Sequence, residues 1–269
     1  MLSNQIRLLF CTCLISLSLQ TCAAAQDVKR FALVIGNTNY RTAPLKNAGN
    51  DANAMAQSLT ALGFQVSLFK DGNLSDLTSQ VQRFYSQVQK DQYSNKLALI
   101  YYAGHAIQVN HHNYIVPLAM KFDNYSEFMS GLYKVDSLFT EINKSPDLQS
   151  IIILDACRNN PFESNAVANN GNMSQGLAPV KAPSNTMIAF ATAPGGVAAD
   201  GADKNGVYTK HLLQHIAKQV RVEEVFKKVR SAVAKETANR QIPWEHSSLL
   251  NEVFFSPPKN RDIPDLISF

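Results

Sequence analysis

The stretch Ile151–Phe162 most constrains how this chain can fold. Four aliphatic residues run directly into Asp155 and Cys157, and Pro161 closes the segment. A continuous apolar run that ends in turn formers predicts a strand buried on both faces of a parallel sheet. Asp155 and Cys157 are two residues apart, so on an extended backbone they face the same side. Ligands of open α/β sheets bind at the carboxyl ends of strands, which makes Cys157 a candidate nucleophile.

The rest of the chain alternates between strand-like and helix-like patterns. Apolar runs predict strands at residues 31–36, 64–70, 96–102 and 186–192, a short edge strand at 114–118 and a last strand near 249–255. Helical spacing of apolar residues predicts helices at about 45–62, 74–88, 135–142, 207–216 and 222–233, with Asn73 as a cap. This alternation predicts right-handed crossovers and a mostly parallel sheet flanked by helices.

The predicted elements fit one domain at residues 26–269. Residues 159–185 are rich in Asn, Gly, Pro and Ala and lack periodicity, which predicts a long loop that is either functional or disordered. This flexible loop would divide the domain into a larger part, residues 28–158, and a smaller part, residues 186–256.

The first 25 residues have the features of a secretory signal peptide. Arg7 is their only charged side chain, Leu8–Leu19 is an apolar run, and Ala23–Ala25 supplies small residues for cleavage. A retained membrane helix would need about 20 apolar residues. We therefore expect cleavage after Ala25 and export to the periplasm or the extracellular space, with a lipid anchor on Cys22 as the weaker alternative.

Cysteine usage supports a functional thiol. Three of the four cysteines lie in the predicted signal peptide, so the exported chain would keep Cys157 alone. A single cysteine in an exported chain indicates a reactive thiol or an intermolecular bridge. The ordinary alternative is a buried core cysteine. A hydrophobic content of 45% is typical of a globular protein, and the scattered basic residues predict neither nucleic-acid nor membrane binding.

His105 ends one predicted strand as Cys157 ends another. If the two strands are neighbours, the thiol and the imidazole face each other, and a base beside a thiol raises its thiolate fraction. The small residues Ala103 and Gly104 would let a substrate backbone approach closely. The alternative for His105 is a strand-end histidine that bonds to the backbone.

These segments resemble a known family. Tyr-Tyr-Ala-Gly-His105 together with Leu-Asp-Ala-Cys157-Arg-Asn-Asn-Pro-Phe is similar to the bacterial caspase-like proteases of the metacaspase and orthocaspase group. Residues 31–37, 45–52 and 241–245 also match, and the resemblance covers about residues 30–255. It implies the caspase-hemoglobinase fold, with a mostly parallel six-stranded sheet in a three-layer sandwich, and a Cys157/His105 catalytic dyad.

The resemblance also implies roles for the atoms of the site. His105 would assist the attack of Cys157 on a peptide carbonyl and then protonate the leaving amine. The backbone N–H groups of Cys157 and Ala106 would hold the oxyanion. The family usually has glycine after the histidine, whereas this chain has Ala106. Alanine keeps the donor, but it would be strained if the site needs a positive φ.

Two acidic residues predict the substrate preference. Asp155 matches a position that is Gln in the animal caspases, which cleave after Asp. An anion there would repel an acidic substrate residue and pair with Arg or Lys. Asp51 matches a second acidic pocket position of metacaspases. The alternatives are a turn acceptor for Asp155 and a solvated helix residue for Asp51. The predicted function is an exported cysteine endopeptidase that cuts proteins or peptides after Arg or Lys.

Further residues allow weaker predictions. Lys181 is a candidate self-cleavage site, with an ordinary exposed lysine as the alternative. Asp200 and Asp203 could bind substrate or calcium, although their spacing matches no calcium loop. We expect a monomer that requires no cofactor, and we leave open whether it binds calcium. Arg158 is assigned to a loop or cleft wall. His211 and His215 are interpreted as helix-surface residues, His111-His112 as a hairpin tip, and Trp244 as a packing residue.

Two rival functions stay open at this point. A caspase-fold binding or scaffold protein without turnover is favoured only by Ala106. A hydrolase or transferase acting on small thioesters or amides would show thiol-dependent activity without peptide cleavage.

Overall fold

The computed structural model describes residues 28–156, 162, 165, 173–174, 176–196, 198, 201 and 203–258. The predicted signal peptide with Cys22 lies outside the described residues, as do Cys157, Arg158 and Asp200. Within these described ranges, no helix is long and apolar enough to cross a membrane.

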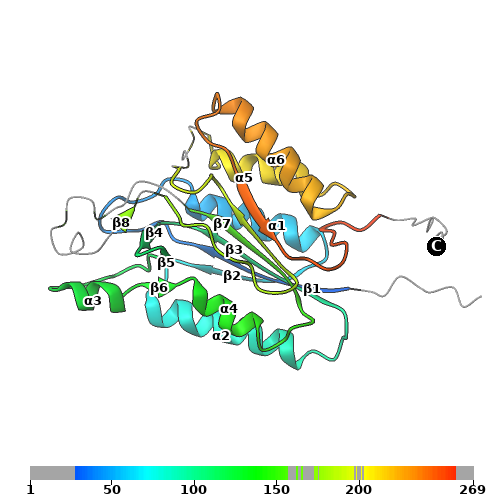
Figure 1. The fold of residues 1–269 in the computed structure, drawn as a ribbon, viewed down its shortest axis with the longest axis horizontal. Coiled ribbons are helices and arrows are strands. Elements are labelled where there is room, and N and C mark those ends of the chain that lie inside the picture. The colour runs from blue at the N-terminus through cyan, green and yellow to red at the C-terminus, as the bar shows by residue number, and fades with distance from the viewer. Residues whose placement is uncertain are drawn as a thin grey trace, which may run out of the picture.

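Six strands form the central sheet, in the order β10-β9-β7-β3-β1-β2 (Figure 1). In that order they span Trp244–Ser247, Thr186–Phe190, Gln149–Asp155, Lys96–Ala103, Lys29–Gly36 and Gln65–Lys70. All neighbours pair in parallel except β10, which runs antiparallel to β9. The prediction of a mostly parallel six-stranded sheet is confirmed.

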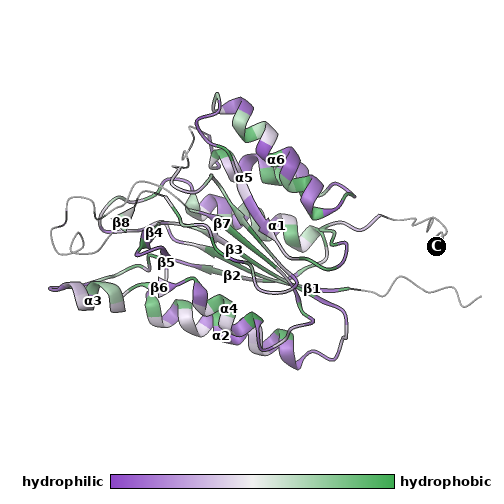
Figure 2. Ribbon diagram, viewed as in Figure 1, coloured by the Kyte–Doolittle hydropathy of each residue, from purple (hydrophilic) through white to green (hydrophobic). Residues whose placement is uncertain are grey.

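Helices cover both faces of this sheet and complete the three layers (Figure 1). One face carries α1, α5 and α6, which span Ala48–Ala61, Val207–His215 and Val222–Glu236. The other face carries α2 and α4, at Leu74–Lys90 and Asp136–Ile142. Strand side chains alternate between the two layers, as in β7, where Ile153 packs with the α1 cluster and Ile152 with the α2 cluster. Figure 2 shows hydrophobic strands between helices whose outer sides are hydrophilic.

The start of α2 follows the predicted cap. The Asn73 side chain accepts from the Asp76 N–H at 3.0 Å, and the Asp76 carboxylate accepts from the Asn73 N–H at 3.4 Å. This reciprocal pair satisfies two backbone donors that a helix leaves open at its N-terminus.

A smaller sheet lies at the carboxyl end of the central one and follows the order β6-β5-β4-β8. These strands span Tyr133–Lys134, His112–Ile115, Ala106–Val109 and Met173–Ser174, and α3 covers Tyr125–Ser130. The strand predicted at 114–118 is confirmed only at residues 114 and 115, which belong to β5. It is not an edge strand, because β5 pairs on both sides, and it ends before Pro117, which has no N–H to donate. The hairpin tip predicted at His111-His112 is confirmed for His111 alone: Asn110 and His111 have φ of 49° and 63° and connect β4 to β5, whereas His112 is the first residue of β5. β8 falls inside the predicted loop 159–185.

The predicted last strand near 249–255 was also wrong. Its apolar residues Val253 and Phe255 are buried in the core without forming a strand, and the Phe255 ring packs against Phe226 at 5.9 Å. The sheet instead ends with β10, whose residues are mostly polar because it is an edge strand and only partly covered. Trp244, interpreted as a packing residue, lies in this strand and is 43% exposed, so it packs only in part.

Candidate active site

The register of the sheet brings the two predicted strand ends together. β3 and β7 are neighbouring parallel strands, and Ala103 lies opposite Asp155. His105 follows Ala103 by two residues, and Cys157 follows Asp155 by two. The condition set by the sequence, that the two strands are neighbours, is therefore met. Cys157 itself lies outside the described residues, so the geometry below concerns His105 and the acidic residues.

The His105 imidazole is buried and oriented by a backbone carbonyl. Its side chain is 3% exposed, and Nε2 lies 2.7 Å from the carbonyl oxygen of Ala43. A carbonyl can only accept, so Nε2 carries a proton in this contact. In the neutral ring, Nδ1 then holds the lone pair and is the nitrogen that can act as a base. Ala43 lies in the loop between β1 and α1, a contact that no sequence pattern signals because a backbone carbonyl makes it.

The backbone after the histidine is an ordinary strand. Ala106 is the first residue of β4 and has no positive φ, so the strain considered for alanine at this position does not arise. Ala106 faces Ile115 in the hairpin, and the Val116 N–H donates to the His105 carbonyl at 3.0 Å. This pattern makes Ala106 and Ile115 a non-hydrogen-bonded pair. The Ala106 N–H therefore points away from β5 and is not used in the pairing of β4 with β5.

Asp155 is a buried carboxylate held by hydroxyl groups. It is 3% exposed, and its Oδ2 accepts from Thr209 of α5 at 2.6 Å and from Tyr101 of β3 at 3.4 Å. The Tyr101 and Thr209 hydroxyls are 2.5 Å apart. Burial, and then the charge of Asp155, raise the pKa of Tyr101 well above its ordinary value, so this phenol stays a neutral donor. These donors orient the carboxylate.

Asp51 links α1 to the beginning of α5. It is completely buried, so the alternative of a solvated helix residue was wrong. Its Oδ1 accepts from the Gly206 N–H at 3.0 Å and from the Asn205 side chain at 2.8 Å. Gly206 is the residue before α5, where the helix dipole favours a negative charge. Asp51 also contributes, after Asp155, to the raised pKa of Tyr101, which places both carboxylates around one phenol.

Three of the other predicted site residues have clear positions. Ala103 is 0% exposed and packs in the core, and its carbonyl accepts from the Asn37 N–H at 2.9 Å. Lys181 is exposed before β9. Asp203, 66% exposed, forms an ion pair with Lys210 at 3.1 Å. Among the described residues, no group of three or more His, Cys, Asp or Glu side chains could hold a metal ion.

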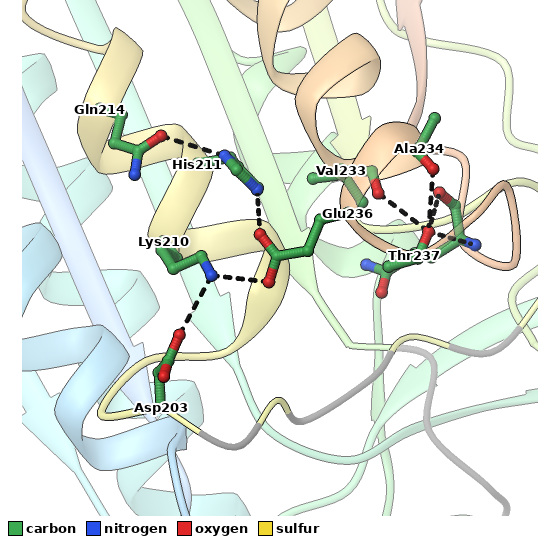
Figure 3. A network of polar contacts seen from close by, with 9 residues as sticks. Asp203, Lys210, His211, Gln214, Val233, Ala234, Glu236 and Thr237 are labelled. Atoms are coloured by element: carbon green, nitrogen blue, oxygen red, sulfur yellow. Dashed lines mark hydrogen bonds and ion pairs between the residues drawn. The ribbon is translucent and has the colours of Figure 1, made fainter.

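The interpretation of His211 as a surface residue was wrong. The residue is 9% exposed, and its ring bonds to Glu236 of α6 at 2.6 Å and to Gln214 at 3.1 Å (Figure 3). Glu236 also binds Lys210 at 2.6 Å, and Lys210 reaches Asp203. This network connects α6 to α5 and to the loop before α5. No sequence pattern predicts this network, because its partners lie on different helices.

The comparisons with known proteins agree with this architecture. The sequence profile of the family described as caspase domain matches residues 29–255. The chain belongs to the caspase domain family. Caspase-1 from Spodoptera frugiperda has a similar fold, with a TM-score of 0.61 and 15% sequence identity over 87% of this chain and 94% of that one. No match to a curated protein sequence was found. As a member of this family the chain is a caspase-like cysteine peptidase, a hydrolase that acts on protein or peptide substrates.

Proposed function

We propose that this protein is an exported caspase-like endopeptidase that uses Cys157 and His105 to cleave peptide bonds after Arg or Lys. The observation that carries the proposal is the Nε2–H contact of His105 with the Ala43 carbonyl, which leaves Nδ1 as the base. The register of β3 and β7 supports a partner at Cys157, because both residues follow paired strand positions by two.

The reaction follows from these protonation states. His105 Nδ1 takes the proton of the Cys157 thiol, and the thiolate attacks the substrate carbonyl carbon. The Ala106 N–H, which β5 does not use, and the Cys157 N–H would bind the oxyanion. Nδ1 then gives its proton to the leaving amine as the C–N bond breaks. Water, deprotonated by the same nitrogen, hydrolyses the thioester and restores the thiol.

The preference for a basic residue is supported by the two buried carboxylates. Asp155 and Asp51 lie on the α1–α5 side of the sheet, where Thr209 donates to Asp155 and the start of α5 donates to Asp51. A buried carboxylate that keeps its charge favours a guanidinium or ammonium group and repels an acidic side chain. Asp155 is the closer candidate, because it precedes the proposed nucleophile by two residues.

Three fluorogenic amides that differ only in the last residue, Arg, Lys or Asp, test this proposal. We expect turnover of the first two, and its loss in Cys157→Ala and His105→Ala. Asp155→Asn should raise KM for the Arg amide more than it lowers kcat. Faster cleavage after Asp would refute the role of Asp155. No turnover of any peptide, with calcium or with a chelator, would favour a binding protein. Turnover of small thioesters alone would favour the acyl-transfer alternative.

Self-cleavage, export and oligomeric state are separate parts of the proposal. Mass spectrometry of the wild type should find a cut after Lys181 that is absent in both Cys157→Ala and Lys181→Gln. The mature N-terminus should begin at Gln26 when the full chain is secreted. Light scattering should give the mass of a monomer.

A further inference from the structure

Two buried tyrosine hydroxyls contact the backbone of His105. The His105 N–H donates to the Tyr40 hydroxyl at 3.0 Å, and the Tyr102 hydroxyl donates to the His105 carbonyl at 2.7 Å. The two hydroxyl oxygens are 3.1 Å apart. Tyr40 is 7% exposed and Tyr102 is 0% exposed, so these contacts are shielded from bulk water.

The carbonyl groups decide part of the order of donors and acceptors. The His105 carbonyl only accepts, so the single proton of Tyr102 points to it. Tyr102 must then accept from Tyr40, and Tyr40 accepts from the His105 N–H. The Tyr40 proton also lies 3.1 Å, between heavy atoms, from the Val116 carbonyl, so it is shared between two acceptors. Burial raises the pKa of Tyr40 to about 12, which keeps this hydroxyl protonated at neutral pH.

The result is a closed set of polar contacts around His105, which forms a ring of hydrogen bonds in one direction when the Tyr40 proton points to Tyr102. It leads from the His105 N–H to Tyr40, then to Tyr102, and back to the His105 carbonyl. Bonds in such a chain polarise and strengthen one another, and breaking one leaves buried polar atoms without a partner. Both peptide groups that flank the Cα of His105 are therefore fixed.

The loop between β1 and α1, which carries Tyr40, also contacts the imidazole. The Tyr40 ring lies 4.5 Å from the His105 ring, between centroids, and Ala43 of this loop binds Nε2. Asp71 anchors the loop, because its carboxylate accepts from the backbone N–H groups of Thr38 at 2.7 Å and Asn39 at 3.1 Å. The backbone and the ring of His105 are thus positioned by one anchored segment.

Gly104 is explained by the hydroxyl pair. A Cβ at this position would lie 2.3 Å from the Tyr102 hydroxyl oxygen and 2.8 Å from that of Tyr40. Any side chain would therefore push the two hydroxyls away from the histidine. The close approach that the sequence assigned to a substrate backbone is made here by the protein itself.

We propose that Tyr40 and Tyr102 are positioning residues that hold His105 Nδ1 at the place where it meets the thiol of Cys157. Neither tyrosine is assigned a contact with the substrate, and the inference rests on the proposed function. A misplacement of about 1 Å in a reacting group can cost about 100-fold in rate. Tyr40→Phe and Tyr102→Phe should therefore lower kcat about 10- to 100-fold and leave KM unchanged.

Alkylation of Cys157 by iodoacetamide tests the pair without any peptide substrate. Cys157 is the only cysteine once the first 25 residues are removed, so the rate reports one thiolate. In the wild type we expect rapid alkylation below the ordinary thiol pKa, and in His105→Ala a profile shifted to higher pH. Both tyrosine variants should shift toward the His105→Ala profile. Tyr85→Phe is the matched control, because Tyr85 is equally buried but lies on α2, and its profile should stay that of the wild type.

Two further measurements keep the outcomes distinct. Gly104→Ala retains both hydroxyls but displaces them, so it should shift the alkylation profile as the tyrosine variants do. Thermal unfolding measures the stability of this variant, and a loss of stability alone would not explain that shift. Hydrogen exchange of the His105 amide should speed up in Tyr40→Phe. Folded tyrosine variants with wild-type kcat and alkylation would overturn the inference. If the wild type and His105→Ala are alkylated alike, the proposed function fails instead. In that case, unchanged exchange of the His105 amide in Tyr40→Phe would overturn the positioning role of the two tyrosines as well.

Discussion

Replacing Thr209 by Val isolates the hydrogen bond that holds Asp155. Thr209 is completely buried in the first turn of α5, and its hydroxyl lies 2.6 Å from Asp155 Oδ2 and 2.5 Å from the Tyr101 hydroxyl. Valine has nearly the shape of threonine and replaces its hydroxyl by a methyl group, and the helix propensities of the two residues are similar. A hydrogen bond to a charged group contributes about 1.5–3 kcal/mol. Because Tyr101 already lies 3.4 Å from Oδ2 and can move closer, we expect a loss of about 2 kcal/mol.

Thr186→Val is the matched control. Thr186 is also completely buried, but its hydroxyl donates to a neutral acceptor, the Ser184 carbonyl, at 3.1 Å. A neutral bond contributes about 0.5–1.5 kcal/mol, so this variant should lose about half as much. Urea unfolding at neutral pH measures both losses, with the slope m unchanged because the exposed surface is the same.

A double-mutant cycle with Asp155→Asn separates the bond from the packing. If the hydroxyl acts through the carboxylate, the effects of Thr209→Val and Asp155→Asn will not add, and the coupling should exceed about 0.5 kcal/mol. Equal losses in Thr209→Val and Thr186→Val, together with additive effects in the cycle, would refute this view of Asp155.

Three other changes test separate features. Ala106→Gly should lower stability by about 0.5–1 kcal/mol in a denaturant melt without raising kcat, because Ala106 already has strand geometry; a gain in kcat would show that the site needs a glycine conformation. Asn73→Ala should cost about 1 kcal/mol by removing the cap of α2, and a loss near zero would contradict the capping box. The contacts with Lys210 lower the pKa of Glu236, so its stabilisation is present above the carboxyl pKa of the unfolded chain and disappears as the pH falls through the lowered value. Glu236→Gln should therefore lower Tm at pH 7 and converge with the wild type in acid, whereas a constant difference would contradict this sign.

Much of the fold could be predicted because its central strands are buried on both faces. The runs that became β1, β3 and β7 are continuous and apolar, whereas the sequence left open whether β3 and β7 are neighbours in the sheet. The errors fall at the edges. Val253 and Phe255 are as apolar as a strand but pack as irregular backbone, while β10 is polar and carries no pattern that distinguishes it from a loop.

The site divides in the same way. His105, Asp155 and Asp51 could be predicted because their residue types have a specific chemistry and because they lie near the ends of strands or helices. Ala43 could not, since any residue supplies a carbonyl and this alanine has a positive φ of 54°, which alanine rarely adopts. Thr209 was missed because its hydroxyl meets Asp155 only after α5 has packed on the sheet.

The contacts assign the rate and the preference of the proposed enzyme to different parts of the chain. The loop after β1 holds His105, so changes there should act on kcat. Gly206 and the first turn of α5 hold the two carboxylates, so changes there should act on KM and on the choice between basic and acidic substrates. The network of Glu236 binds α6 to this part of α5 through His211 and Lys210 (Figure 3). A variant in that network would therefore alter substrate preference from a distance, while the alkylation of the thiol by iodoacetamide stays that of the wild type.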